Sequence, residues 1–350
     1  MKIDPEIARR VKAVVENCKI EVPTWQIWDC KGDVRDQIVS YAVKDKVVGV
    51  YEMLAEMALT DGAKDKRLLV AIADSWPHFR DRAFQIQAST PAAAERVIAL
   101  YARATGSERF PEAAVPLAAG KHAELSAALG KLPASSKLRH AAISAYLDWG
   151  GSTRLSDVQT FYAKASDDGE RYAAAWAVGN AIGDNLDRAM GKPELAGADK
   201  TKLCDWVKGI ATDAAATTGA VAGAVASLGR CQGAYIDDAL TALEGQLANG
   251  KLTADLTTAL HHMCWGGVVT GGTINGTKAQ CARAFDLLAT GVAGKDVPPG
   301  VLRTALWTAG ALAQNEPGLG ARTKQLLAKF TGHADKDVAD QARDGIKEIH

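Results

Sequence analysis

The sequence predicts an all-α fold, an α-α superhelix built from antiparallel helical hairpins. Apolar residues recur at spacings of three and four along most of the 350-residue chain, which places them on one face of successive helices. Hydrophobic residues make up 47% of the chain and aromatic residues only 6%. Much of the apolar share is alanine, which favours helices over sheets. No segment alternates β-branched and polar residues for long enough to predict a strand.

The repeating unit is clearest between residues 298 and 349. Two prolines begin the first helix, because proline is tolerated in the first helical turn. Residues 315–318 interrupt the apolar spacing, a second helix runs to Gly332, and a third follows Asp335. One amphipathic helix of this length is unstable alone in water, and such short connections make neighbouring helices pack antiparallel. The unit is therefore a row of hairpins.

Two segments at opposite ends of the chain carry a similar motif. Residues 337–346 read Asp-Val-Ala-Asp-Gln-Ala-Arg-Asp-Gly-Ile, and residues 32–38 read Gly-Asp-Val-Arg-Asp-Gln-Ile. Both resemble the second-helix signature of HEAT repeats, although Ala339 stands where that family usually has arginine. The resemblance implies a HEAT-like α-solenoid, an array whose curved surface engages a partner.

Capping and proline signals place the other helices in order. The first starts at Asp4 and ends near Cys18, and the second begins after Asp33. Further helices are predicted at about 47–59, 66–76, after Pro77, from Thr90, and at about 136–149, 154–165, 169–182, 199–211, 214–230, 234–248, 252–265 and 277–290. We expect a single array over residues 1–350, or two sub-arrays, 1–109 and 134–350, joined by an irregular helical region at 110–133.

Charge and hydropathy exclude some functions. Forty-one basic residues balance forty-one acidic ones, so the chain has no net field with which to attract a polyanion, which argues against nucleic-acid binding. No segment approaches the roughly 20 uncharged apolar residues of a membrane span.

The six cysteines are the most specific chemical signal. A bare count of six allows 15 pairings, but the helix positions bring together Cys18 with Cys30, Cys204 with Cys231, and Cys264 with Cys281. Three such disulfides would indicate a periplasmic or secreted protein. The alternative is six buried thiols in a cytoplasmic protein. Zinc is a weaker choice, because there is no Cys-x-x-Cys pair.

Other candidate site residues are few. His261 and His262 are adjacent on a helix, so their side chains point about 100° apart and do not converge on a metal. The segment 271–278 has its threonine and lysine in the wrong order for a phosphate-binding loop. We interpret it as an inter-helix loop with a possible binding role, carried by Gly271, Gly272, Asn275 and Gly276. No catalytic residue, metal site or cofactor is predicted.

A further recurrence concerns tryptophan and glycine. Ala174-x-Trp176-x-x-Gly179 and Ala305-x-Trp307-x-x-Gly310 each place a ring one turn from a glycine. This spacing predicts that a neighbouring helix approaches closely there. The alternative is two core tryptophans in an alanine-rich protein.

The function that these patterns favour is a non-enzymatic scaffold that binds another protein or a peptide. One alternative is a helical-toroid enzyme acting on glycans, which needs carboxylates and aromatic side chains converging in a cavity. Another is a HEAT-like nucleic-acid-binding protein, which needs a strongly positive face.

Overall fold

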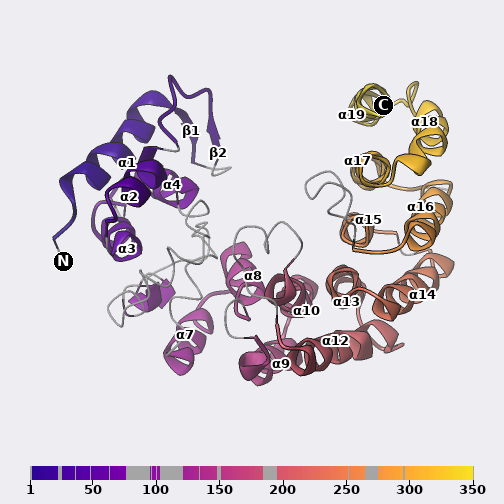
Figure 1. The fold of residues 1–350 in the computed structure, drawn as a ribbon, viewed down its shortest axis with the longest axis horizontal. Coiled ribbons are helices and arrows are strands. Elements are labelled where there is room, and N and C mark those ends of the chain that lie inside the picture. The colour runs from indigo at the N-terminus through magenta and orange to yellow at the C-terminus, as the bar shows by residue number, and fades with distance from the viewer. Residues whose placement is uncertain are drawn as a thin grey trace. The chain divides into compact units, whose positions relative to one another are not determined.

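The structure is a computed structural model. It describes residues 2–22, 26–35, 37–47, 49–62, 64–75, 95, 97–99, 101–102, 121–133, 135–147, 151–183, 195–250, 252–264, 275–294 and 296–349. Nearly all regular structure in these residues is helical, and neighbouring helices pack on one another (Figure 1), which confirms the predicted all-α, solenoid-like fold.

The chain divides into two compact units. Unit 1 comprises residues 1–150 and 190–192, and unit 2 comprises residues 151–189 and 193–350. The irregular region predicted at 110–133 is described only from Lys121 onward. The predicted helices after Pro77 and from Thr90 also begin outside the described residues. The division into sub-arrays 1–109 and 134–350 therefore stays a prediction.

Unit 1 contains short helices and one small hairpin. Its helices are α1 (Pro5–Asn17), α2 (Gln37–Lys44), α3 (Val50–Thr60), α4 (Lys66–Ser75), α7 (His122–Leu129) and α8 (Lys137–Ser144). As predicted, the Asp4 carboxylate caps α1 by accepting a hydrogen bond from the Glu6 amide at 2.7 Å. Helix α2 begins at Gln37, three residues later than the sequence suggested.

The expectation that the chain has no strand is wrong. Strands β1 (Lys19–Glu21) and β2 (Gln26–Trp28) pair antiparallel, with Ile20 opposite Ile27. Three residues are too few to show the alternation by which a strand is recognised in a sequence. The Cys18–Cys30 disulfide lies directly outside this pair of strands and joins their outer ends.

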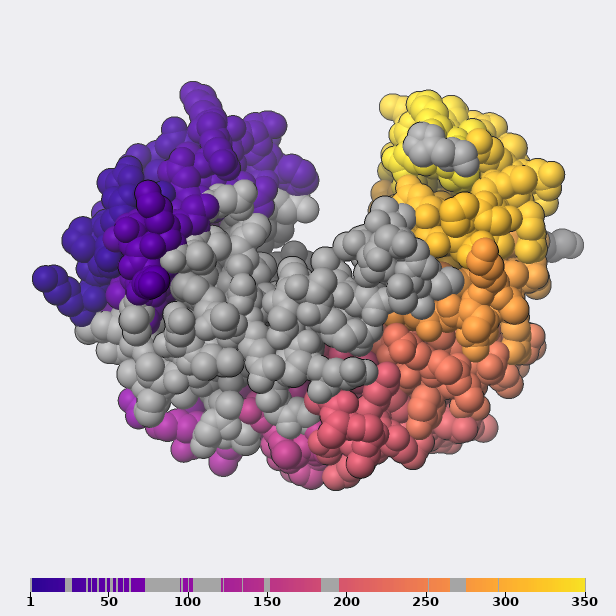
Figure 2. Space-filling view, viewed as in Figure 1, coloured from indigo at the N-terminus to yellow at the C-terminus, as the bar shows by residue number. Residues whose placement is uncertain are grey.

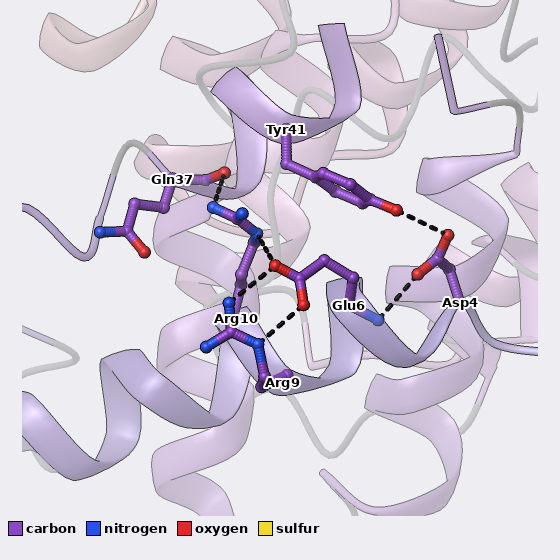
Figure 3. Close-up of polar contacts among 6 residues, drawn as sticks. All are labelled: Asp4, Glu6, Arg9, Arg10, Gln37 and Tyr41. Atoms are coloured by element: carbon purple, nitrogen blue, oxygen red, sulfur yellow. Dashed lines mark hydrogen bonds and ion pairs between the residues drawn. The ribbon is translucent and has the colours of Figure 1, made fainter. Parts of the chain in front are cut away.

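Polar contacts tie α1 to α2 (Figure 3). Arg10 Nη1 donates to the main-chain oxygen of Gln37 at 2.9 Å, and the Tyr41 hydroxyl donates to Asp4 Oδ2 at 3.2 Å. Arg10 also lies over the Tyr41 ring, 4.9 Å from its centroid. The same Asp4 carboxylate therefore caps α1 and holds α2.

Glu6 organises the two arginines of this network. Its carboxylate accepts hydrogen bonds of 2.7 Å from Arg9 and from Arg10 (Figure 3). The Arg9 hydrogen bond, followed by the charges of both arginines, lowers the pKa of Glu6 from 4.5 to about 2. Because the pKa is lower in the folded state, the stabilisation is fully present above pH 4.5 and is lost as the pH falls toward 2.

We expect Glu6→Gln to lower the thermal midpoint of unit 1 at pH 6. The difference from the unchanged protein should shrink as the pH falls from about 4.5 to about 2, since protonation removes the same charge. Circular dichroism melting over this range measures it, with Glu16→Gln, exposed on the same helix, as the matched control. A difference independent of pH would contradict the assignment.

Unit 2 is a longer series of helices. They are the 3₁₀ turn η3 (Gly151–Arg154), α9 (Leu155–Lys164), α10 (Asp168–Ile182), α12 (Gly197–Thr212), α13 (Thr218–Cys231), α14 (Ala234–Ala248), α15 (Ala254–His261), α16 (Lys278–Val292), α17 (Pro299–Asn315), η4 (Pro317–Leu319), α18 (Gly320–Ala328) and α19 (Lys336–Glu348). The helices predicted in this region are confirmed, with ends that shift by up to four residues.

These helices form two rows (Figure 1). Helices α10, α13, α15, α17 and α19 pack on one another in sequence and form the inner row of unit 2, on the inside of its bend. Helices α12, α14, α16 and α18 lie outside them. Side chains close the spaces between neighbouring helices (Figure 2). Because each hairpin reverses direction, all inner-row helices run the same way, and their carboxyl ends lie along one edge of unit 2, the carboxyl edge.

Helix α13 is the most enclosed member of the inner row. All of its residues from Gly219 to Gly229 are buried. A Cβ on Gly223 would lie 2.4 Å from the Tyr172 carbonyl oxygen of α10, and one on Gly219 would lie 2.7 Å from the Asp168 side chain. Glycine is therefore required at both positions for α10 and α13 to approach this closely.

The three predicted cysteine pairs are confirmed at disulfide distance. Their Cα atoms lie 4.0 Å apart for Cys18–Cys30, 6.0 Å for Cys204–Cys231 and 5.7 Å for Cys264–Cys281. The second pair joins α12 to the last residue of α13, and the third joins the turn after α15 to α16. Cys204 lies in the middle of α12. Among the described helices, none is long and apolar enough to cross a membrane.

We expect the paired substitution Cys204→Ala/Cys231→Ala to destabilise unit 2 by roughly 3 kcal/mol, because the lost cross-link closes a loop of 27 residues. The Cys18–Cys30 disulfide closes a shorter loop, of 12 residues, in unit 1. The paired substitution Cys18→Ala/Cys30→Ala should therefore leave the unfolding free energy of unit 2 unchanged. Urea unfolding followed by tryptophan fluorescence, with peptide mass mapping of the unreduced protein, measures both. Equal unfolding midpoints for the Cys204 variant and the unchanged protein would contradict this role.

Candidate functional site

A row of aromatic rings and one arginine crosses the inner row, from the middle of α10 and of α17 to the carboxyl ends of α13 and α15. It consists of Trp176 on α10, Arg230 on α13, His261 and His262 at the end of α15, and Trp307 on α17, and we call it the ring cluster. Ring centroids lie 4.7 Å apart between Trp176 and His262, 5.5 Å between His262 and His261, and 5.1 Å between His261 and Trp307. Four neighbouring helices of the inner row, α10, α13, α15 and α17, therefore contribute side chains to one continuous series of contacts.

Arg230 covers one end of the ring cluster. Its guanidinium carbon lies 4.5 Å from the centre of the Trp176 ring, a cation–π geometry. Its Nη1 donates to the Gly179 carbonyl oxygen at 3.0 Å and lies 3.5 Å from Asn180 Oδ1. The arginine is thus held against α10 by the same turn that supports the tryptophan.

Gly179 on α10 and Ser227 on α13 allow these two helices to pack closely beside Trp176. A Cβ on Gly179 would lie 2.6 Å from the Trp176 ring and 3.0 Å from Ser227 Oγ on α13. The Ser227 hydroxyl accepts from the Gly179 amide at 2.9 Å and donates to the Ala175 carbonyl oxygen at 2.8 Å. The close helix approach predicted from the tryptophan–glycine spacing is confirmed here.

The same interpretation is wrong for Trp307. No described atom outside the helix backbone lies within 4 Å of where a Cβ on Gly310 would be, so none of the described helices approaches closely at that glycine. The Trp307 side chain is instead 45% exposed, whereas most of the inner row around it is buried. The ring cluster therefore runs from a packed tryptophan to one that faces solvent.

Helix α13 also fixes the two histidines. A Cβ on Gly229 would lie 3.0 Å from the main-chain carbon of His262, so the end of α15 rests directly on α13. Cys231 follows Arg230 in the chain, and Cys264 lies two residues after His262. The two disulfides of unit 2 therefore hold the segments that carry the arginine and both histidines.

His262 is held neutral in this environment. Its Nδ1 atom is buried and has no hydrogen-bond partner among the described residues. Burial, then the charge of Arg230, then His261, lower the pKa of His262 well below its ordinary value of 6.5. In the described part of the chain no group of three or more His, Cys, Asp or Glu side chains is placed to hold a metal ion.

We expect the stability of unit 2 to fall as the pH drops below about 6.5. The unfolded chain binds a proton on His262 there and the folded protein does not, so the slope from this residue is at most about 1.4 kcal/mol per pH unit. His262→Asn should flatten the pH dependence of the urea-unfolding free energy between pH 7 and 5. His140→Asn, on α8 of unit 1, is the control. An unaltered slope in His262→Asn would contradict the assignment.

Asn275 and Gly276, two residues of the predicted binding loop, are structural neighbours of the ring cluster. Asn275 is 7% exposed, and its Nδ2 donates to the main-chain oxygen of His262 at 2.7 Å. A Cβ on Gly276 would lie 2.8 Å from the Met263 carbonyl oxygen. Both residues therefore buttress the turn after α15. Gly271 and Gly272 lie outside the described residues, so their binding role stays a prediction.

The amino ends of the inner row carry carboxylates. Asp168 accepts hydrogen bonds from the Thr217 hydroxyl and from the Gly219 amide, the latter at 2.8 Å, and so caps α13 from the neighbouring helix. Partial burial and the Asp168 charge raise the pKa of Asp255. Burial, followed by the Asp255 charge, raises the pKa of Tyr172 to about 12. The contacts of Asp168 are those of a helix cap.

The fold and the ring cluster define a class, a disulfide-linked, all-α protein of solenoid-like helical hairpins. Neither a scan against family models nor a search of curated proteins finds a match for the chain.

Sequence reasoning noted both tryptophans and the histidine pair but did not join them, and it missed Arg230. A single basic residue in the last turn of a helix is common, because it complements the helix dipole. The sequence feature that could have identified Arg230 is its position beside Cys231, because a predicted disulfide restrains the residues next to it in the chain.

Proposed function

We propose that this protein is a non-enzymatic scaffold that binds another protein or a peptide through the inner row of unit 2, with the ring cluster as the centre of contact. The observation that carries the proposal is Trp307, which is 45% exposed and makes an edge-to-face contact with the buried His261 ring. Tryptophan and arginine are the residues most enriched at the energetic centres of protein interfaces.

The support behind Trp307 is rigid. His261 packs against its ring, and His262 and Trp176 continue this series of tilted ring contacts. Two disulfides cross-link the chain next to Arg230 and near His262. A partner that covers such a side chain loses little conformational entropy on the scaffold side, which favours binding. The resemblance of two segments to HEAT repeats supports the same class.

The compartment follows from the disulfides. Three cross-links persist in an oxidising environment and are rare in the reduced cytoplasm. We infer a periplasmic or secreted protein, whose partner is another protein of that compartment. The equal numbers of basic and acidic residues argue against a nucleic acid as partner.

Photo-crosslinking tests the proposal. Gln314 is exposed on α17 and lies seven residues after Trp307, on the same helix face. A benzoylphenylalanine at position 314 should form one discrete adduct in an extract of the oxidising compartment. Trp307→Ala should reduce that adduct about tenfold or more, as expected for loss of an interface-centre tryptophan.

Trp28→Ala is the matched control, because Trp28 is 46% exposed but belongs to unit 1. It should leave the adduct unchanged. Equal melting curves for the two variants would show that both are folded. An adduct that is equally strong in Trp307→Ala, or a failure to form any adduct, would overturn the proposal.

A further inference from the structure

A pocket of about 500 Å³ opens on unit 2 at the end opposite the ring cluster. It lies between the last turns of α14 and α16 and the segments that follow each of them. Because hairpins alternate in direction, the carboxyl ends of these outer helices lie at the amino ends of the inner row. No residue of the ring cluster lines the pocket, so the inference below does not depend on the proposed function.

The walls of the pocket are apolar. Leu247 of α14, Leu252 of the following segment and Leu287 of α16 line it, and all three are only half-buried. The leucines of the inner-row core are buried, for example Leu260 and Leu306 with at most 1% exposed. Half-buried leucines around a cavity present apolar surface that a ligand would remove from water.

Glycine keeps the pocket open. A Cβ on Gly291 of α16 would lie 3.1 Å from Leu247 Cδ2 and 3.2 Å from both Cδ atoms of Leu252. A larger side chain at this position would displace the two leucines or occupy the space between them. The cavity therefore depends on the absence of a side chain at residue 291.

The two carboxylates at the rim differ in their ion pairing among the described residues. Glu244 and Asp296 both line the pocket, but the Glu244 carboxylate pairs with Arg283 at 2.7 Å. Asp296 is exposed and has no cation partner among the described residues. Its φ of 65° lies in the left-handed region, where a side chain costs free energy that glycine would not. The turn thus carries an aspartate beside the cavity in a conformation better suited to glycine.

We propose that this pocket binds a small amphiphilic amine, with the apolar part against the leucines and the protonated nitrogen at Asp296. The volume lies within the range of small-molecule sites, and one charged group at the rim of an apolar wall sets the orientation of a ligand. The described lining residues supply this pairing of an apolar wall with one exposed carboxylate.

Fluorescence titration of the full chain with two probes tests this. Dansylcadaverine joins an apolar ring system to a primary amine, and anilinonaphthalene sulfonate is an apolar anion of similar size. We expect saturable binding of dansylcadaverine and at least about tenfold weaker binding of the anion. Gly291→Leu should abolish amine binding, whereas Gly245→Leu, on α14 with open space around it, should leave it unchanged.

Charge reversal keeps the test valid if Gly291→Leu fails to fold. Asp296→Lys alters an exposed turn, and Lys46 already adopts the same backbone region in this protein with a φ of 51°. This variant should weaken dansylcadaverine about tenfold and strengthen binding of the anionic probe. Equal affinity for both probes, or amine binding that Asp296→Lys leaves unchanged, would overturn the proposal.

Discussion

The close approach of α13 to its neighbours is the constraint on which unit 2 depends. At Gly223 and Gly229, main-chain atoms of α10 and of the turn after α15 occupy the space where a side chain would stand. Only because these helices are so near can Trp176 and His262, which flank α13 in the inner row, bring their ring centroids within 4.7 Å. The ring cluster is therefore a consequence of small residues on a helix that contributes no ring of its own.

Disulfides and a side-chain hydrogen bond hold the same edge of unit 2. The Cys204–Cys231 and Cys264–Cys281 disulfides end beside Arg230 and His262, and Asn275 closes the turn between them through the His262 carbonyl oxygen. The His262 imidazole stays neutral here first because it is buried and then because the neighbouring Arg230 guanidinium disfavours a second positive charge. The same residues thus stabilise unit 2 and support the exposed Trp307 side chain.

Local signals in the sequence predicted most helices, since caps such as Asp4 and breaks such as residues 315–318 act within a few residues. The cysteine pairs were predictable because each is local in the chain: Cys18 and Cys30 flank one loop, and the other two pairs link consecutive helical segments. The β1–β2 hairpin was missed, because three-residue strands carry no periodicity. The ring cluster was not predictable as a unit, since it depends on which helices meet across α13. Gly179 and Gly310 have the same local pattern, yet among the described helices only Gly179 has a close neighbour.

The position of α13 inside a covalent loop has a mechanical consequence. Cys204 and Cys231 enclose the whole of this helix, so tension applied to the two ends of the chain bypasses it through the disulfide. The 27-residue separation corresponds to roughly 90 Å of fully extended chain that stretching cannot release while the bond is intact. While the bond is intact, tension on the chain ends therefore does not act along α13, the most enclosed helix of the inner row.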